Sequence, residues 1–363
     1  MTARYEGVSR PFCVVVLAAG AGTRMRSAQP KVLHQLCGRA MVHYVLDAVN
    51  HEDAQSTLVV IGPHATEIEK ELGERSAAGS LHFAVQSEPL GTGHAVAAAI
   101  VNLDALVGEG DSDVLIVPGD APLLRRESVA DLVSRHRSSR AALTVLSATL
   151  EDPSGYGRLV RARDSTLERI VEERDASPEE RAIREVNTSV MVVRQSLLGP
   201  GLRRVGRYNA QGEYYLTDLV AVLHDMGHPT RAVALEDARE AFGVNDRRQL
   251  AYAESVLRAR INATWMERGV TMRDPASTYL DADVELAPDV ILWPGTTLRG
   301  RCVVGGGSEI GPNADLEDVV VGRGVHLGAV RARGARFGDG ASVGSFVTIE
   351  RGAVIDAGVR VAR

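Results

Sequence analysis

The sequence predicts an α/β protein in which a Rossmann-like domain with a mixed, mostly parallel sheet is followed by a short left-handed parallel β-helix. Three observations indicate this fold. Short β-branched runs alternate with amphipathic helical runs up to about residue 245, one long helical stretch follows, and beyond it apolar residues recur every six positions. Alternating strands and helices are typical of a parallel sheet covered on both faces, and a period of six is typical of stacked β-helix coils.

The first half supplies the strands and helices of the predicted sheet. The expected strands lie at 12–20, 56–62 and 113–120, and the expected helices at 40–50, 65–73 and 127–137. Ligands bind such sheets at the carboxyl ends of the strands. The residues that follow the strands are therefore the first candidates for a site.

The second half begins with a helix and continues with six-residue repeats. Apolar residues at helical spacing fill 246–269, and Gly269 ends that helix. The repeat anchors are Leu298, Val304, Ile310 and Leu316, then Phe337, Val343, Ile349, Ile355 and Val361. A small or β-branched residue follows most anchors by four positions: Cys302, Ser308, Ala314 and Val320, then Ala341, Val347, Ala353 and Val359. Between Leu316 and Phe337 the period slips, which indicates an irregular coil or a loop.

Three parts are therefore expected: a nucleotide-binding type of domain at 1–245, a helical linker arm at 246–269 and a short β-helix at 270–363. The alternative for the last part is an ordinary β-sandwich with turn glycines. Nine anchors in two registers favour the β-helix.

Composition excludes several classes of protein. The 363 residues carry 41 Lys and Arg against 47 Asp and Glu, a net charge of -6, which argues against nucleic acid as a partner. Three cysteines stand far apart without a CxxC pair, so neither a zinc cluster nor a disulfide framework is indicated. The longest apolar stretch begins at Phe12 and is too short to span a membrane, and no signal peptide precedes it. We expect a cytoplasmic protein that does not associate with membranes.

A glycine-rich loop follows the first strand, in the stretch LAAGAGTRMRSAQPKVLH that begins at Leu17. It contains neither a Walker P-loop nor a dinucleotide fingerprint. Gly20 and Gly22 allow close approach of the backbone, and Arg24 and Lys31 lie within reach of the same loop. Backbone N–H groups and two cations suit a phosphate group, although a turn with two solvated cations is the alternative for the loop alone.

Eight ordered motifs carry a resemblance to a known family. The glycine loop resembles the signature of sugar-nucleotide pyrophosphorylases. It is followed by QSEPLGTGHAV, GDAPLL, GYGR, IVEERDA, EVNTS, NAQGEYYLTD and GVNDRRQLA. In this order they are similar to the uridyltransferase half of bifunctional N-acetylglucosamine-1-phosphate uridyltransferase/glucosamine-1-phosphate acetyltransferases, over roughly residues 12 to 350. The resemblance implies a nucleotidyltransferase domain at 1–245 and a homotrimer formed through the β-helix.

The resemblance also implies a role for each motif. Ala19, Gly20 and Gly22 would hold the nucleotide, with Gln86, Gly91 and Thr92 at the uracil edge. Arg24 and Lys31 would lie on the triphosphate and act in catalysis. Asp120 and Asn245 would hold Mg²⁺, and Gly157, Glu172 and Asn187 would contact the sugar. Taken alone, Asp120, Asn187 and Asn245 would be interpreted as turn residues and Glu172 as part of a solvated acidic run.

The chemistry implied is attack by the phosphate oxygen of a sugar 1-phosphate on the α-phosphorus of a nucleoside triphosphate, with release of pyrophosphate. The anionic phosphate is itself the nucleophile, so the protein supplies none. The leading hypothesis is a monofunctional uridylyltransferase that makes UDP-N-acetylglucosamine from UTP.

Departures from the family pattern leave alternatives open. Ser189 replaces a glycine beside Asn187, and Pro118 precedes Gly119–Asp120 where the family often has tyrosine or serine. Both changes touch the acceptor pocket, so a relative specialised for another sugar 1-phosphate or another nucleotide is an alternative, and a non-catalytic sensor is a third. In the second domain Glu350 and Arg351 stand where the family has arginine and proline, and its histidine and NYDG motifs do not occur in the sequence. We therefore expect no acetyl-CoA site.

Overall fold

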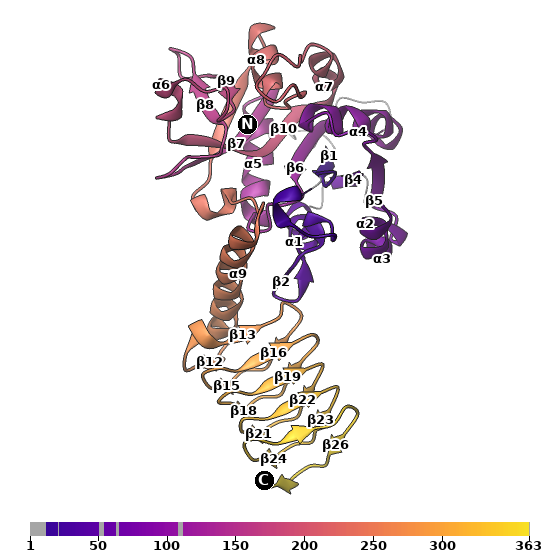
Figure 1. The fold of residues 1–363 in the computed structure, drawn as a ribbon, viewed down its shortest axis with the longest axis vertical. Helices are drawn as coiled ribbons and strands as arrows, with labels where there is room; N and C mark the ends of the chain where they lie inside the picture. The colour runs from indigo at the N-terminus through magenta and orange to yellow at the C-terminus, as the bar shows by residue number, and fades with distance from the viewer. Residues whose placement is uncertain (1–11, 21, 51–53, 63–64, 108–111, 363) are drawn as a thin grey trace, which may run out of the picture. The chain divides into compact units, whose positions relative to one another are not determined.

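The computed structural model describes residues 12–20, 22–50, 54–62, 65–107 and 112–362 (Figure 1). They form two compact units. The first combines the described residues up to His34 with Met41–Gln249, and the second combines Gln35–Ala40 with the described residues from Leu250 onward.

The first unit is built on a mixed sheet in the order β11-β7-β10-β6-β1-β4-β5, with β8 beside β10 and β9 beside β8. The pairs of β1 with β4 and β6, of β4 with β5 and of β7 with β11 are parallel, whereas β10 is antiparallel to β6, β7 and β8. This confirms the predicted mixed, mostly parallel sheet. The strands are β1 Phe12–Leu17, β4 Ala54–Ile61, β5 Leu81–Val85, β6 Asp113–Pro118, β7 Leu143–Thr149, β8 Arg158–Arg161, β9 Leu167–Val171, β10 Glu185–Arg194 and β11 Thr230–Ala234.

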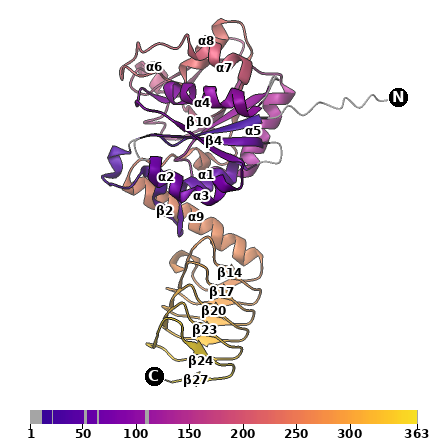
Figure 2. The ribbon, with the colours of Figure 1, turned by 90° about the vertical axis from the view of Figure 1, so that its right-hand side faces the viewer.

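Helices cover both faces of this sheet, because its central strands are apolar on both sides. Figure 2 shows α4, α7 and α8 on one side and α1, α2 and α3 on the other. The bounds are α1 Met41–Val49, α2 Ala65–Glu71, α3 Gly73–Ala77, α4 Thr92–Val107, α5 Arg126–Ser138, α6 Pro178–Arg181, α7 Gln195–Leu202 and α8 Asp218–Asp225, with 3-10 turns η1 Thr23–Met25, η2 Lys31–Leu33 and η3 Ala238–Ala241. Among the described helices, none combines the length and the apolar character needed to cross a bilayer.

The strand order reverses between β1 and β6. From β1 the chain builds outward through β4 to β5, then returns to place β6 on the opposite side of β1. At this point the backbones of the two strand ends meet, because Gly119 N donates to Leu17 O at 2.9 Å. A crevice at such a switch point is where open α/β sheets bind their ligands.

The second unit contains most of helix α9 (Arg247–Glu267), from residue 250 onward, and a parallel β-helix (Figure 1). Three parallel sheets form its sides, in the orders β12-β15-β18-β21-β24-β27, β13-β16-β19-β22-β25 and β14-β17-β20-β23-β26. Their strands are β12 Thr271–Met272, β13 Tyr279–Leu280, β14 Glu285–Leu286, β15 Ile291–Leu292, β16 Thr297–Arg299, β17 Val303–Val304, β18 Glu309–Ile310, β19 Asp315–Glu317, β20 Val320–Val321, β21 His326–Leu327, β22 Arg331–Arg333, β23 Arg336–Phe337, β24 Ser342–Val343, β25 Thr348–Ile349, β26 Val354–Ile355 and β27 Arg360–Val361, with the turn η4 Pro275–Ser277 before β13.

The predicted anchors from Leu298 to Ile349 are buried in one continuous core. This core begins at Val270, before the first anchor that the six-residue repeat indicated. The slip after Leu316 is an ordinary coil rather than a loop. The anchors Val321, Leu327 and Ala332 are all buried, and three of the four steps from Leu316 to Phe337 are five residues long instead of six.

Val320, which follows the anchor Leu316 by four positions, points away from the core. Because the step from Leu316 is one residue short, Val319 and Val321 point inward and Val320 is 40% exposed. Val359 is likewise 40% exposed. It belongs to the last described coil, which has no further coil stacked on it.

A hairpin that the sequence analysis missed belongs to the second unit. Strands β2 Gln35–Leu36 and β3 Arg39–Ala40 are joined by Cys37 and Gly38, both with positive φ. Ala282 N donates to Cys37 O at 2.9 Å, and a Cβ on Gly38 would lie 2.4 Å from the Asp281 carboxyl carbon. Burial and the nearby Glu254 and Asp281 raise the pKa of the Cys37 thiol to about 12, so this cysteine stays protonated.

Candidate active site

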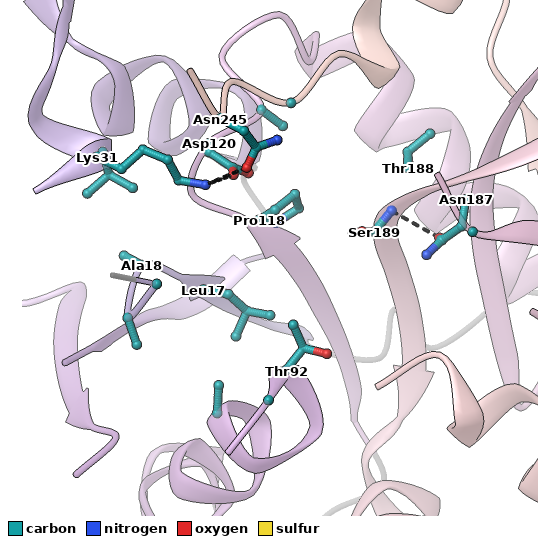
Figure 3. A pocket seen from close by; sticks show the side chains of 18 of the residues that line it. Leu17, Ala18, Lys31, Thr92, Pro118, Asp120, Asn187, Thr188, Ser189 and Asn245 are labelled. Atoms are coloured by element: carbon teal, nitrogen blue, oxygen red, sulfur yellow. Dashed lines mark hydrogen bonds and ion pairs between the residues drawn. The ribbon is translucent and has the colours of Figure 1, made fainter. Parts of the chain in front are cut away.

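A cavity of about 540 Å³ opens at the carboxyl ends of β1 and β6. Its walls come from distant parts of the first unit, and Figure 3 shows Lys31, Asp120 and Asn245 gathered on one side, with Asn187, Thr188 and Ser189 across from them. Residues of the predicted site that line it are Ala19, Gly20, Lys31, Gln86, Gly91, Thr92, Asp120, Gly157, Glu172, Asn187 and Asn245. Gly22 and Arg24 are the two predicted site residues outside the lining set.

Gly22 contributes to the cavity through its neighbour. Its φ is +59°, and a Cβ there would lie 2.8 Å from Lys31 Cβ. The glycine therefore provides the left-handed turn and the space that let the Lys31 side chain cross the loop. Arg24 reaches the same place from η1, where its guanidinium donates to Asn245 Oδ1 at 3.0 Å.

Asp120 and Asn245 direct oxygen atoms at one point. The Lys31 ammonium bonds Asp120 Oδ2 and lies 3.0 Å from Asn245 Oδ1. The two loops are joined by the backbone, because Val244 N donates to Asp120 O at 2.9 Å, and Gln249 Oε1 accepts from Asn245 N at 2.7 Å. The Lys31 ammonium and the Arg24 guanidinium therefore lie together beside the glycine loop, where they can attract a phosphate group.

This donor set fits a hard divalent cation. A carboxylate and an amide oxygen are the ligands such ions prefer, and Mg²⁺ commonly takes one or two protein ligands together with substrate oxygens and water. Among the described residues no group of three or more His, Cys, Asp or Glu could hold a metal. Any metal at this place would therefore depend on substrate oxygens for most of its ligands.

Gln86 and the loop after β5 form another wall. Gln86 N donates to Ile61 O at 2.8 Å, which extends the pairing of β5 with β4 to the cavity. Gly91 adopts φ +107°, and a Cβ there would lie 2.6 Å from Tyr214 O. Thr92 begins α4, and its Oγ1 accepts from Leu216 N at 3.0 Å. The segment around Tyr214 therefore packs against the loop that contains Gly91 and fixes its position.

Glu172 lies opposite, at the end of β9. A Cβ on Gly157 would lie 3.4 Å from Glu172 Oε2 and 2.9 Å from Ile170 Cγ2, so the glycine makes room for this carboxyl. Burial raises the pKa of Glu172 above its usual value of 4.5, against the hydrogen bond from Thr217. The adjacent Glu173 turns away and pairs with the buried Arg158 at 2.7 Å.

A bulge in β10 shapes the last wall. The pairing with β7 shifts between Asn187 and Met191, and Ser189 adopts φ +63°. Asn187 Oδ1 accepts from Ser189 N at 2.9 Å, while Asn187 N donates to Gly157 O at 2.8 Å. The bulge brings Asn187, Thr188 and Ser189 together on the cavity wall.

Sequence reasoning missed three residues that support the site. Thr217 bonds Glu172, Arg158 holds the loop before β8 through Glu173, and His94 contacts Gln86. All three lie inside the quoted motifs, but only their side-chain contacts distinguish them from their neighbours.

Comparison with known proteins agrees with this geometry. Residues 14–193 match the family model of the MobA-like NTP transferase domain. The chain is 43% identical over 349 residues to the bifunctional protein GlmU of Trichlorobacter lovleyi. The aligned region covers 96% of this chain and 74% of that protein. The chain is 42% identical over 346 residues to GlmU of Mycobacterium tuberculosis (95% and 69%), and 41% identical over 350 residues to GlmU of Desulfitobacterium hafniense (96% and 75%).

Proposed function

The chain belongs to the family of the bifunctional protein GlmU, and from that membership we infer that it is an N-acetylglucosamine-1-phosphate uridylyltransferase, converting UTP and the sugar phosphate to UDP-N-acetylglucosamine and pyrophosphate. One observation carries this function. A single cavity at the switch point is lined by the glycine loop with Lys31, by Gln86 on another wall, and by Glu172 and Asn187 on the wall opposite. Such a cavity can hold a nucleoside triphosphate and a sugar phosphate side by side.

The reaction needs orientation and charge neutralisation rather than a protein nucleophile. A phosphate oxygen of the sugar 1-phosphate forms the new bond to the α-phosphorus, and the bond from that phosphorus to the bridging oxygen of pyrophosphate breaks. Gly20 and Ala19 approach the phosphates through their backbones. Arg24 and Lys31 neutralise the charge that builds on the phosphoryl oxygens and on the leaving group.

Members of this family work with a divalent metal ion, and we propose that here it is Mg²⁺, held by Asp120 and Asn245. When bound, the ion would neutralise negative charge on the phosphate groups of the substrates. Lys31 pairs with Asp120 in the protein alone. That pairing holds the Asp120 carboxylate at the wall of the cavity.

Selectivity for the acceptor comes from the wall of Gly157, Glu172 and Asn187. The Glu172 carboxylate form can accept hydrogen bonds from sugar hydroxyl groups, and the Asn187 amide can donate to an acyl oxygen. A related function, transfer to another sugar 1-phosphate, has one specific observation in its favour: the Ser189 hydroxyl stands on this wall where the family resemblance implies glycine.

Pyrophosphate release tests the assignment. Purified protein with Mg²⁺ is assayed with each of the four NTPs and dTTP against N-acetylglucosamine, glucosamine and glucose 1-phosphates. Turnover confined to UTP with N-acetylglucosamine 1-phosphate supports the proposed reaction, and another preferred pair supports the specialised relative. No turnover across the grid would indicate a sensor.

We also propose that the β-helix assembles the chain into a homotrimer. On the face of β14-β17-β20-β23-β26, Val303 and Val320 stack in register and are 39% and 40% exposed. Arg336 follows in the same register, and beyond it Val354 of β26 is 63% exposed. Exposed apolar side chains gathered on one face, beside a charged residue, are typical of a surface that a partner covers. We assign no acetyl transfer to this β-helix because Glu350 and Arg351 replace the arginine and proline that the resemblance implies.

A further inference from the structure

The amide of Gln86 is held by two groups of the protein. Its Nε2 donates to Gly91 O at 3.1 Å and lies 3.2 Å from His94 Nδ1. Gly91 O is a carbonyl and can only accept, so the NH₂ end of the amide must face it. The side chain is 6% exposed, which leaves it little room for another arrangement.

His94 completes this orientation. With one NH₂ proton on Gly91 O, the second is directed at His94 Nδ1, which can accept it only when the ring carries its proton on Nε2. Within the described parts of the chain, Gln86 Oε1 has no hydrogen-bond partner, and Gln86 lines the cavity. The polar atom left for a ligand is therefore an acceptor.

The ring of His94 is fixed from its far side. It stands in the first turn of α4 and stacks on Tyr214 with 6.5 Å between ring centroids and 27° between planes. Tyr214 is itself anchored, because its N donates to Leu90 O and its O accepts from Gly93 N, each at 2.8 Å. The loop, the helix start and the tyrosine thus hold Nδ1 toward Gln86.

We propose that His94 is a positioning residue that sets, through Gln86, the hydrogen-bond polarity with which this cavity selects the base. This rests on the proposed function. An Oε1 acceptor matches the N3–H donor of uracil, whereas cytosine presents an unprotonated N3 that would face it lone pair to lone pair. The base preference then belongs to the pair His94–Gln86 rather than to Gln86 alone.

Two substitutions separate this role from simple packing. His94→Phe keeps a ring for Tyr214 but removes the acceptor nitrogen. His94→Asn places an amide oxygen near the position of Nδ1. His228→Phe, before β11 and outside the cavity lining, controls for the loss of a histidine ring. His94→Leu replaces His94→Phe if the latter does not fold.

The measurement is kcat/KM for UTP and for CTP at saturating sugar 1-phosphate. For His94→Phe we expect the KM for UTP to rise about tenfold and the UTP-over-CTP preference to fall about tenfold, with the KM for the sugar phosphate unchanged. His94→Asn should recover most of both losses. An unchanged UTP/CTP ratio in His94→Phe, or an equal fall in His94→Asn, would overturn the proposal.

Wild-type protein distinguishes failure of this proposal from failure of the proposed function. If it shows no preference for UTP over CTP, or no turnover, the proposed function itself is wrong. If it prefers UTP, N3-methyl-UTP should be rejected, since the methyl group removes the donor that Gln86 Oε1 accepts. Acceptance of N3-methyl-UTP would overturn the polarity argument even where UTP is the substrate.

Discussion

Thr217 Oγ1 donates a hydrogen bond of 2.9 Å to Glu172 Oε1 across 45 residues of sequence. The same segment supports the opposite wall, where Leu216 N donates to Thr92 Oγ1 at 3.0 Å. Leu216 and Thr217 are adjacent, so one short stretch of chain fixes the side proposed for the base and the side proposed for the sugar. Displacement of either wall would be transmitted to the other.

The loss of activity at low pH, the acid limb of the pH profile, should reflect protonation of Glu172. Burial raises its pKa, and the Thr217 bond works against that rise. As pH falls through the raised pKa, the carboxylate is protonated and its capacity to accept sugar hydroxyls falls, so kcat/KM for the sugar phosphate should decrease. Thr217→Val should move this limb to higher pH. Glu172→Gln should raise the sugar KM about tenfold and remove the limb.

The control for this series is Glu179→Gln on α6, an exposed carboxylate outside the cavity lining. Steady-state kinetics from pH 4.5 to 8 provide the measurement. A limb that stays in place in Thr217→Val would contradict the assignment.

Asp120→Asn should separate the metal role from packing. The substitution keeps the shape of the side chain but removes the charge that faces Lys31. We expect kcat to fall about a hundredfold and the Mg²⁺ concentration for half-maximal rate to rise. Asp246→Asn, one residue beyond Asn245, should leave both close to wild type. Equal Mg²⁺ titrations for wild type and Asp120→Asn would rule out Asp120 as a ligand.

Sequence reasoning could find the fold because its signals are local. Strand and helix periods and the six-residue anchors each depend on a few neighbouring residues, and the predicted anchors from Leu298 to Ile349 are buried accordingly. The repeat alone does not show that Val320 points outward, because a step shortened by one residue reverses the side to which the next residue points. A strict six-residue count cannot detect that change.

The candidate site was predicted less completely, because its support is long-range. The motif order indicated the strand ends and loops that line the cavity, but no period in the sequence connects Thr217 with Glu172 or His94 with Gln86. The hairpin at 35–40 was missed for the same reason. Its residues group with a unit that resumes at Leu250.

Two glycines of the cavity should respond differently to alanine. At Gly91 the positive φ and the 2.6 Å approach to Tyr214 O leave no room for Cβ, so Gly91→Ala should lower stability by about 2 kcal/mol or more. At Gly20 nothing lies within 4 Å of a Cβ. Gly20→Ala should therefore keep the melting temperature while raising the KM for UTP about tenfold, because the methyl group would take space used by the phosphates. Thermal unfolding and kinetics on both variants test this; an unchanged KM would remove Gly20 from the phosphate site.

Val320→Asp should dissociate the proposed trimer. The new carboxylate would be buried at the proposed interface between Val303 and Arg336, where the loss of its hydration is costly. Light scattering after size-exclusion chromatography should show monomers, whereas His326→Asp, on another face of the β-helix, should keep the wild-type mass. A wild-type mass for Val320→Asp would place the interface elsewhere or remove it.

Ser189→Gly should test both the strain and the chemistry of the β10 bulge. A serine in the left-handed region costs about 1–2 kcal/mol, and the extra freedom of glycine in the unfolded chain offsets about 0.4–1 kcal/mol of its relief. The free energy of unfolding should therefore rise by about 0.5 kcal/mol. Ser189→Val should lower it by more than that, because β-branched side chains fit this region poorly. If the hydroxyl contributes to selection of the sugar, Ser189→Gly should also change the ratio of kcat/KM between N-acetylglucosamine and other sugar 1-phosphates. A gain in stability with an unchanged ratio of kcat/KM would show that the backbone at Ser189 is strained and that its hydroxyl takes no part in sugar recognition.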